Sequence, residues 1–211
     1  VLGLLLSFPI NASALDFMPA NPPVPAEVVY KGVTEEQWKT IDKIGDPLNC
    51  RKQVYDLQNI SIDDYFQITT DDCLNNKSCI EDALLKHDQV MLRKGVYKLP
   101  TGLFLTSQQL IGYPGETIII NAEEAMTAFE ISNSILSNLI IQNSKNIGIA
   151  FSSNNLVYRV VVGNTGVYFK NSVRGIGFNQ KRGVEGNCIV SAESYNGYNY
   201  LAGYRLGMNG G

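Results

Sequence analysis

Short apolar runs that end on asparagine recur along the second half of the chain. Three of them share one pattern, and their asparagines are 22 and 21 residues apart. They occupy 117–121, 139–143 and 160–164. After each asparagine and a short polar turn a second run follows, at 127–131, 147–151 and 166–169. Two strands in each repeat, with no helix between them, predict a β-solenoid of stacked turns.

Alternation within the strands predicts how one turn packs on the next. Residues two apart on a strand point to the same face. Alignment by asparagine therefore places Ile141 beneath Val162 and above Ile119, and places Leu139 between Val160 and Thr117 in the same way. Asparagine suits the corners, because it tolerates left-handed backbone angles and its amide can bond along a stack. The expected structural ladder is Asn121, Asn143 and Asn164.

A sandwich of antiparallel hairpins is the alternative architecture. Its turns would recur about every 8–12 residues without a longer register. We therefore expect an all-β fold, a parallel β-helix with a small α-containing N-terminal cap.

The pattern weakens after Phe169. The run 173–179 is a candidate for the next strand, but its asparagine comes only 15 residues after Asn164, and the next clear run, 188–190, is late by several residues. An insertion around 171–187 would explain both irregularities. Insertions of this kind carry function on solenoids.

The first half of the chain predicts two short helices. Residues 34–37 match a capping box and are followed by apolar residues at helical spacing, so a helix is expected over about 35–44. A second helix is expected over 80–87, with its apolar residues on one face. The segment 50–79 is acidic and weakly patterned. From residue 90 onward, short β-rich runs broken by Gly and Pro predict strands and turns.

The first ten residues are an apolar block, followed by Asn11-Ala12-Ser13-Ala14, which has the A-x-A form of a signal-peptidase site. We expect cleavage after Ala14 and export to an extracellular or periplasmic compartment. A buried strand or a membrane anchor is the alternative, although ten residues are fewer than the roughly 20 that span a bilayer. We also expect the sequence to begin inside its signal and to end, at Gly211, before the solenoid closes. Four regions are expected: signal peptide 1–14, proline-rich linker 15–33, cap region 34–89 and incomplete β-helix 90–211.

The four cysteines fit an oxidising compartment and allow three pairings. Cys73–Cys79, which closes the short loop CLNNKSC, is the expected disulfide. Cys50 and Cys188 either pair or stay free. A zinc site would need closely spaced cysteines or nearby histidines, and His87 is the one histidine of the chain. No metal is therefore expected at these thiols.

Charge is distributed unevenly. The chain has a formal net charge of −3. From Ile131 onward there are seven basic and two acidic residues, so this segment has a net charge of +5 and residues 1–130 have a net charge of −8. The seven are Lys145, Arg159, Lys170, Arg174, Lys181, Arg182 and Arg205. This cationic, tyrosine-rich part favours an anionic partner, and scattered solvated charges are the alternative. Nucleic acid is not expected as a partner of an exported protein.

Two segments resemble a known superfamily. Residues 90–105, VMLRKGVYKLPTGLFL, are similar to its "strand, Gly, x-Tyr, x-x-Pro-x-Gly" entry after a short capping helix, and 110–118, LIGYPGETI, is similar to its first-coil segment. With the asparagine-ended runs, the chain over about 75–211 resembles the right-handed parallel β-helix superfamily. This is the pectin-lyase-like fold of secreted polysaccharide lyases, hydrolases and epimerases. The resemblance implies the fold more specifically than the activity.

Three activities of that superfamily can be compared with the residues present. Hydrolases of the polygalacturonase type need a cluster of Asp on one strand face, but no Asp follows Asp88. Calcium-dependent pectate lyases need several carboxylates around the ion, and Glu185 and Glu193 are too few. The Asp-Pro-His-Asp cluster of alginate-epimerase-type sites is not found in the sequence. No cofactor is evident, and Ca²⁺ is not supported by these residues.

β-Elimination or epimerisation at a uronate remains. A cation must stabilise the charge that develops on the carboxylate, and a base must take the proton alpha to it. The candidate catalytic residues are Arg174, Lys181, Arg182 and Tyr195. The candidate substrate-binding residues are Tyr168, Lys170, Tyr198 and Arg205. The alternative for each is a solvated cation or a tyrosine that covers a coil edge.

The segment 193–200, ESYNGYNY, is the densest local feature of this region. Aromatic faces stack on sugar rings, so it is either a glycan-binding loop or an edge turn.

Two function classes stay open from the sequence. The first is a secreted carbohydrate-active protein that acts on an anionic, uronate-containing polysaccharide, most simply as a polysaccharide lyase of pectate-lyase-like type. The second is a non-catalytic β-helix surface protein, an adhesin or a glycan-binding module. For both we expect a monomer with no membrane span.

Overall fold

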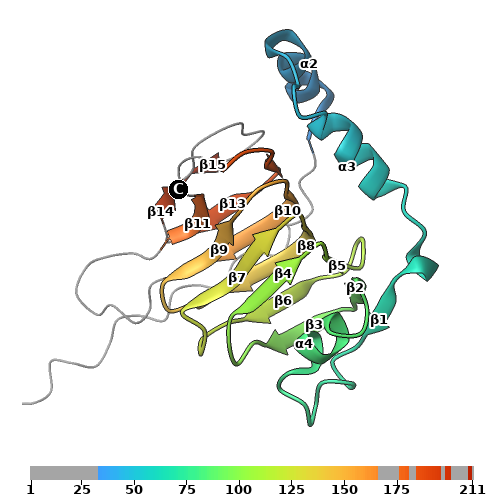
Figure 1. Cartoon of the computed structure of the whole chain (residues 1–211), viewed down its shortest axis with the longest axis vertical. Helices are drawn as coiled ribbons and strands as arrows, with labels where there is room; N and C mark the ends of the chain where they lie inside the picture. The colour runs from blue at the N-terminus through green and yellow to red at the C-terminus, as the bar shows by residue number, and fades with distance from the viewer. Residues whose placement is uncertain (1–32, 166–175, 181–183, 196–197, 201–208, 211) are drawn as a thin grey trace, which may run out of the picture.

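The computed structural model is a mostly β chain, a parallel β-solenoid of about four turns with short helices at its N-terminal end (Figure 1). It describes residues 33–165, 176–180, 184–195, 198–200 and 209–210, the last two ranges as backbone. The expected signal peptide, 1–14, and all of the expected linker but Val33 lie outside the described residues.

Every strand pair is parallel, and the strands form three faces. Two long strands, β8 (Ile135–Gln142) and β10 (Leu156–Gly163), bend in the middle and contribute one half to each of two faces. The first face joins their first halves with β1 (Phe66–Ile68), β2 (Gln89–Leu92), β5 (Gln109–Gly112) and β12 (Cys188–Val190). The second joins their second halves with β3 (Gly95–Lys98), β6 (Ile118–Asn121), β13 (Glu193–Tyr195) and β15 (Asn209–Gly210). The third consists of β4 (Leu103–Thr106), β7 (Thr127–Ser132), β9 (Ile147–Phe151), β11 (Ile176–Gln180) and β14 (Tyr198–Tyr200).

Residues with left-handed backbone angles mark the corners between the faces. Asn138 (φ 55°) and Arg159 (φ 53°) stand where β8 and β10 bend. Asn143 (φ 67°) and Asn164 (φ 55°) follow the ends of the same two strands. A single left-handed residue turns an extended chain sharply, and asparagine tolerates that conformation better than most residues. The asparagine-rich corners of the sequence are explained in this way.

The strand register confirms the repeat and corrects it in one place. Ile141 pairs with Val162 as expected. Towards the preceding turn, however, Ile141 lies opposite Ile120 rather than Ile119. The alignment by asparagine was therefore wrong by one residue, and such a slip exchanges the two faces of a strand. Ile118 and Ile120 are fully buried, whereas Ile119 lies on the outer side and is half-buried.

The irregular part of the repeat is an insertion, as expected. Residues paired between β8 and β10 are 21 apart in sequence, as in Ile135 and Leu156, while Leu156 and Cys188, paired between β10 and β12, are 32 apart. The second strand expected at 166–169 lies outside the described residues, and β11 pairs with β9 in that place.

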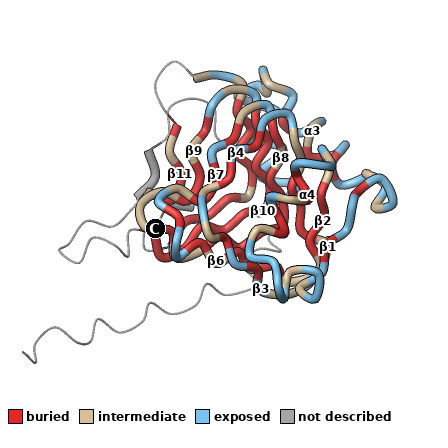
Figure 2. The backbone as a smooth tube through the Cα atoms, turned by 60° about the horizontal axis from the view of Figure 1, so that its bottom comes forward, coloured by how far each residue is buried: buried red, intermediate tan, exposed pale blue. Residues whose placement is uncertain are grey.

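The core lies inside the coil, and α4 (Cys79–Leu84) closes its N-terminal end with Ile80 and Leu84. This helix is shorter than the expected 80–87. Figure 2 shows buried backbone along the strands and exposed backbone at the turns between them. The helix expected over 35–44 is α2 (Glu35–Ile44), and its capping box between Thr34 and Gln37 is formed.

One helix was not expected, α3 (Cys50–Gln58), which lies in the weakly patterned segment. A 3₁₀ turn, Ile62–Asp64, leads from it to β1. Figure 1 shows α2 and α3 along one side of the solenoid. Within the described ranges, no helix is long and apolar enough to cross a membrane.

Both pairs of cysteines form disulfides. Cys73–Cys79 is the bond that the short loop predicted. Cys50–Cys188 joins the start of α3 to β12, so these two cysteines pair rather than stay free. Two disulfides fit an extracellular compartment.

Candidate functional site

Most of the candidate catalytic and substrate-binding residues lie outside the described residues. Six of them lie outside the described residues: Tyr168, Lys170, Arg174, Lys181, Arg182 and Arg205. Tyr195 ends β13 and Tyr198 begins β14, and for both the backbone alone is described. These two strands belong to different sheets, since β13 pairs with β10 and β14 pairs with β11. The backbone therefore places Tyr195 and Tyr198 on different faces of the solenoid.

The outer side of the third face carries exposed side chains, among them Phe104, Thr106 and Glu130. We call it the open face and define it by the outward residues of β4, β7, β9 and β11. One row of these residues crosses four strands in register: Phe104, Glu130, Ala150 and Asn179. Since neighbouring strands are about 4.8 Å apart, the row is about 14 Å long. No described helix packs on this face, whereas α3 packs on the first face.

The row combines different side-chain types. Phe104 is 73% exposed, Glu130 is exposed, and Asn179 is half-buried. Beside it, Thr106 and Ser132 are paired on neighbouring strands and supply hydroxyls. An exposed ring next to amide, hydroxyl and carboxylate groups can stack on a flat polar ligand and hydrogen-bond to it. The sequence analysis missed this row, although the alternation in LFLT, 103–106, places Phe104 on the outer side.

A ladder of buried polar side chains lies on the inner side of one corner, and the sequence analysis also missed it. Asn155 Oδ1 accepts the Ser134 N–H at 3.0 Å, and Asn155 Nδ2 donates to Asn187 Oδ1 at 2.8 Å. All three residues are at most 3% exposed. Each directly precedes a strand of the first face. Ser134 and Asn155 are 21 residues apart, as in the repeat, but Asn187 follows Asn155 by 32 residues, so the repeat spacing points to the first step alone.

Of the expected ladder Asn121, Asn143 and Asn164, the contact between Asn121 and Asn143 is present. Asn143 Nδ2 donates to Asn121 Oδ1 at 2.9 Å, although the two strands pair Asn121 with Gln142. Asn164 lies one residue beyond β10, as Asn143 lies beyond β8. Asn121 and Asn143 thus hold two neighbouring turns together and are structural residues.

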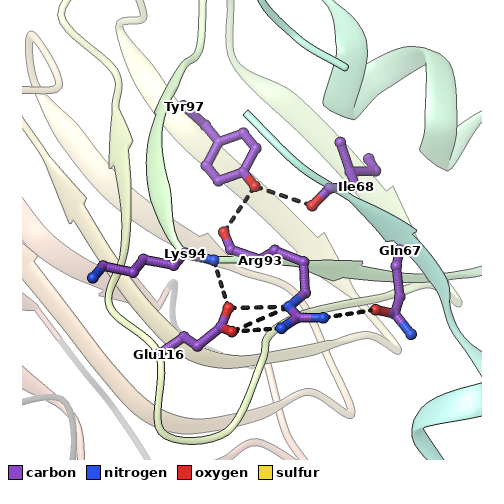
Figure 3. A network of polar contacts seen from close by, with 6 residues as sticks. All are labelled: Gln67, Ile68, Arg93, Lys94, Tyr97 and Glu116. Carbon is purple, nitrogen blue, oxygen red and sulfur yellow. Dashed lines mark hydrogen bonds and ion pairs between the residues drawn. The ribbon is translucent and has the colours of Figure 1, made fainter. Parts of the chain in front are cut away.

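An ion pair joins the two segments that resemble the superfamily (Figure 3). Arg93 Nη2 lies 2.6 Å from Glu116 Oε1, and the guanidinium lies 4.0 Å from the centre of the Tyr113 ring. Glu116 also accepts the Lys94 N–H at 2.6 Å. The hydrogen bonds from Arg93 hold the pKa of Glu116 below its ordinary value.

In the same cluster, the buried Tyr97 hydroxyl lies within hydrogen-bond distance of the Ile68 and Arg93 carbonyl oxygens, and burial raises the pKa of Tyr97 to about 12. A tyrosine of that pKa is a poor base at neutral pH. The cluster of Figure 3 is therefore a structural clamp on the first turn.

A shallow groove of about 220 Å³ lies between β1, the Cys73–Cys79 loop and α4. The rings of Phe66 and His87 stack at its rim, with their centroids 4.0 Å apart. The Asp72 carboxylate in the groove accepts from both the backbone N–H and the hydroxyl of Thr69, and these bonds lower its pKa. That carboxylate is thereby engaged in holding its own loop.

Within the described part of the chain, no three His, Cys, Asp or Glu side chains are grouped so that they could hold a metal ion. No protein-family model, curated protein or solved structure matches the chain.

Proposed function

We propose that the chain is a carbohydrate-active protein of the pectin-lyase-like kind that binds an anionic, uronate-containing polysaccharide on the open face and cleaves it by β-elimination. The observation that carries the proposal is the row Phe104, Glu130, Ala150 and Asn179 on a parallel sheet that no helix of the described residues covers. A row about 14 Å long suits an extended polymer better than a compact metabolite.

The charge of the sequence supports an anionic polymer. Arg174 precedes β11 by two residues, and Lys181 and Arg182 follow it directly. β11 lies between β9 and β14 in the sheet that carries the open face. Since Glu130 lies towards the other edge, a uronate would be attracted to the β11 side and the Phe104 side would receive a sugar ring by stacking.

The reaction that fits these side-chain types is elimination. A base takes the proton from the carbon alpha to the carboxylate, the bond between the neighbouring carbon and the glycosidic oxygen breaks, and that oxygen is protonated. The products are an unsaturated uronate and a new chain end. Arg174 is the proposed cation for the developing negative charge, and removing such a group costs roughly 10²–10³ in rate.

The test is the appearance of new ultraviolet absorbance when the full-length protein is incubated with pectate, alginate or a glycosaminoglycan. Arg174→Ala should reduce the rate by roughly 10²–10³, while Lys52→Ala, an exposed cation on α3, should leave it unchanged. Equal effects of the two substitutions would contradict the proposed role of Arg174. Absence of cleavage on the whole panel would overturn the lyase.

Binding without catalysis is the second candidate function. Phe104 favours it, because an aromatic ring that is 73% exposed on a flat, polar sheet is sufficient to hold a sugar. Affinity electrophoresis in gels that contain each polysaccharide separates the two functions. The matched control is Leu85→Ala, which changes an exposed apolar residue directly after α4. If migration is retarded without cleavage, and the retardation is lost in Phe104→Ala but kept in Leu85→Ala, the protein is a binding module and not an enzyme.

A further inference from the structure

Residues 34–65, which include α2 and α3, run along the outside of the first face, and we call them the strap. Three side-chain contacts follow its course along the first face, from β12 back to β5. Cys50 is bonded to Cys188 of β12, Gln58 Nε2 donates to the Tyr158 hydroxyl of β10 at 2.7 Å, and Tyr65 bonds Gln109 of β5. The chain then enters the coil as β1.

The strap and the coil have separate hydrophobic cores. Inside the coil, the core consists of residues such as Phe129, Leu139 and Val160, and no residue of the strap belongs to it. The second core lies on the outer side of the first face. There Val54 and Leu57 of the strap pack with outward residues of the strands: Met91, Ile111, Leu156, Tyr158 and Val190. The sheet itself separates the two cores.

The backbone of the strap is also independent of the coil. Across the described residues, the backbone-to-backbone hydrogen bonds of 46–65 are local, for example Gln53 N–H to Asn49 O and Tyr65 N–H to Ile62 O. The capping and ion pairs of the strap are local as well, as between Arg51 and Asp42. No strand of the coil would lose a ladder hydrogen bond if 46–65 moved away.

Apart from the main chain that continues into β1, one covalent bond and side-chain contacts hold the strap to the coil. We propose that the strap is a detachable cover whose latch is the Cys50–Cys188 disulfide, and that breaking this bond releases the strap while the coil stays folded. Cys50 and Cys188 are both 0% exposed, so a dithiol reductant reaches their bond when the strap opens locally. One thiolate of the reductant then attacks one sulfur and releases the other cysteine, and its second thiolate displaces the first cysteine from the mixed disulfide. The cysteines receive two electrons and two protons, and the reductant leaves as its own disulfide.

Release has a defined structural consequence. It uncovers the apolar outer side of the first face, which Val54 and Leu57 cover in the oxidised protein. It also frees β12, which the latch holds against the strap. The proposal concerns the first face and does not depend on the function proposed for the open face.

The experiment compares amide hydrogen exchange in the oxidised full chain, in the chain reduced under native conditions, and in the double variant Cys50→Ser/Cys188→Ser. Peptides from 46–65 should exchange at least about tenfold faster in the last two samples, and peptides from β5 and β8 should change little. The matched control is Cys73→Ser/Cys79→Ser, which removes the other disulfide and should leave the strap protected. In the reduced sample, mass spectrometry after alkylation identifies the opened disulfide.

Two results would overturn the proposal. If 46–65 stays protected without the Cys50–Cys188 bond, side chains alone hold the strap and the bond is not its latch. If β5 and β8 lose protection together with the strap, or the double variant fails to fold, the strap belongs to the fold of the coil and is not detachable.

Discussion

Asn155→Ala should destabilise the solenoid more than substitution of the corner asparagine Asn143. Asn155 is 1% exposed, and its side chain bonds groups on both sides of its own turn. Its Oδ1 accepts the Ser134 N–H at 3.0 Å, and its Nδ2 lies within hydrogen-bond distance of Ser152 O (2.9 Å), Ile131 O (3.2 Å) and Asn187 Oδ1 (2.8 Å). One buried amide thus connects three successive turns.

The magnitude follows from what alanine leaves unpaired. The Ser134 N–H loses its acceptor and stays buried, which costs about 1–3 kcal/mol. The Ser152 carbonyl loses the donated Nδ2 hydrogen bond, while the Ile131 carbonyl keeps the Ser152 N–H at 2.8 Å. With the packing lost around the removed amide, the free energy of unfolding should fall by about 3 kcal/mol. At about 2–4 °C for each kcal/mol, the melting temperature should fall by roughly 6–12 °C.

The assay is urea and thermal unfolding of the oxidised full chain, followed by circular dichroism. The matched control is Asn143→Gly, since Asn143 is half-buried, donates one side-chain hydrogen bond to Asn121, and has a φ of 67° that glycine adopts without strain. It should cost no more than about 1 kcal/mol. If the two variants lose similar stability, the buried hydrogen bonds of Asn155 to Ser134 and Asn187 do not stabilise the solenoid as expected.

Three further substitutions test the first turns. Glu116→Gln removes a carboxylate whose pKa Arg93 lowers. The contribution of this carboxylate to the free energy of unfolding is present above its ordinary pKa of 4.5 and is lost as the pH falls through the lowered pKa. Thermal melts should therefore separate this variant from wild type at neutral pH but not in strong acid. Tyr97→Phe should cost about 1–2 kcal/mol in urea unfolding at neutral pH. Because burial raises the pKa of Tyr97 to about 12, its contribution is present below pH 10 and lost between 10 and about 12, so the variant should lose less stability over that range. Gly112→Ala would place a Cβ 2.1 Å from the Asn138 carbonyl oxygen, so the free energy of unfolding should fall by more than about 1 kcal/mol. A smaller loss would show that the strands can separate there.

The coil was predictable from the sequence because its period is imposed by strand pairing. Turns that stack in parallel register tend to have similar lengths, and 21 residues separate the paired residues of β6 and β8 and those of β8 and β10, although 26 separate those of β5 and β8. The choice of register at β6 was not predictable, because Ile118, Ile119 and Ile120 are three equivalent apolar residues in a row. A continuous apolar run carries no alternation, so nothing local decides which of its residues point inward.

α3, the part of the strap that the sequence did not predict, was missed because its pattern of buried residues is short. α3 has three buried residues, Cys50, Val54 and Leu57, and its N-cap residue, Asn49, makes no side-chain capping bond. A helix of nine residues with these features is marginal alone and is stabilised by packing and by the bond to Cys188. The available signal lay elsewhere, in strands such as 109–112 that are apolar on both faces and therefore require a cover.

The candidate site was harder to predict than the fold because repeated polar residues on a solenoid mark structure rather than ligand binding. A ladder needs like partners at each step, which is why Asn155 meets Asn187 and Asn143 meets Asn121. A polymer lying across the turns meets a different chemical group at each step, so its contacts have no reason to repeat in type. The row that begins with Phe104 and Glu130 satisfies this condition, because it keeps strand register while its side chains differ. In a coil of this kind, an exposed row that does not repeat is therefore a better indicator of a binding site than a repeated one.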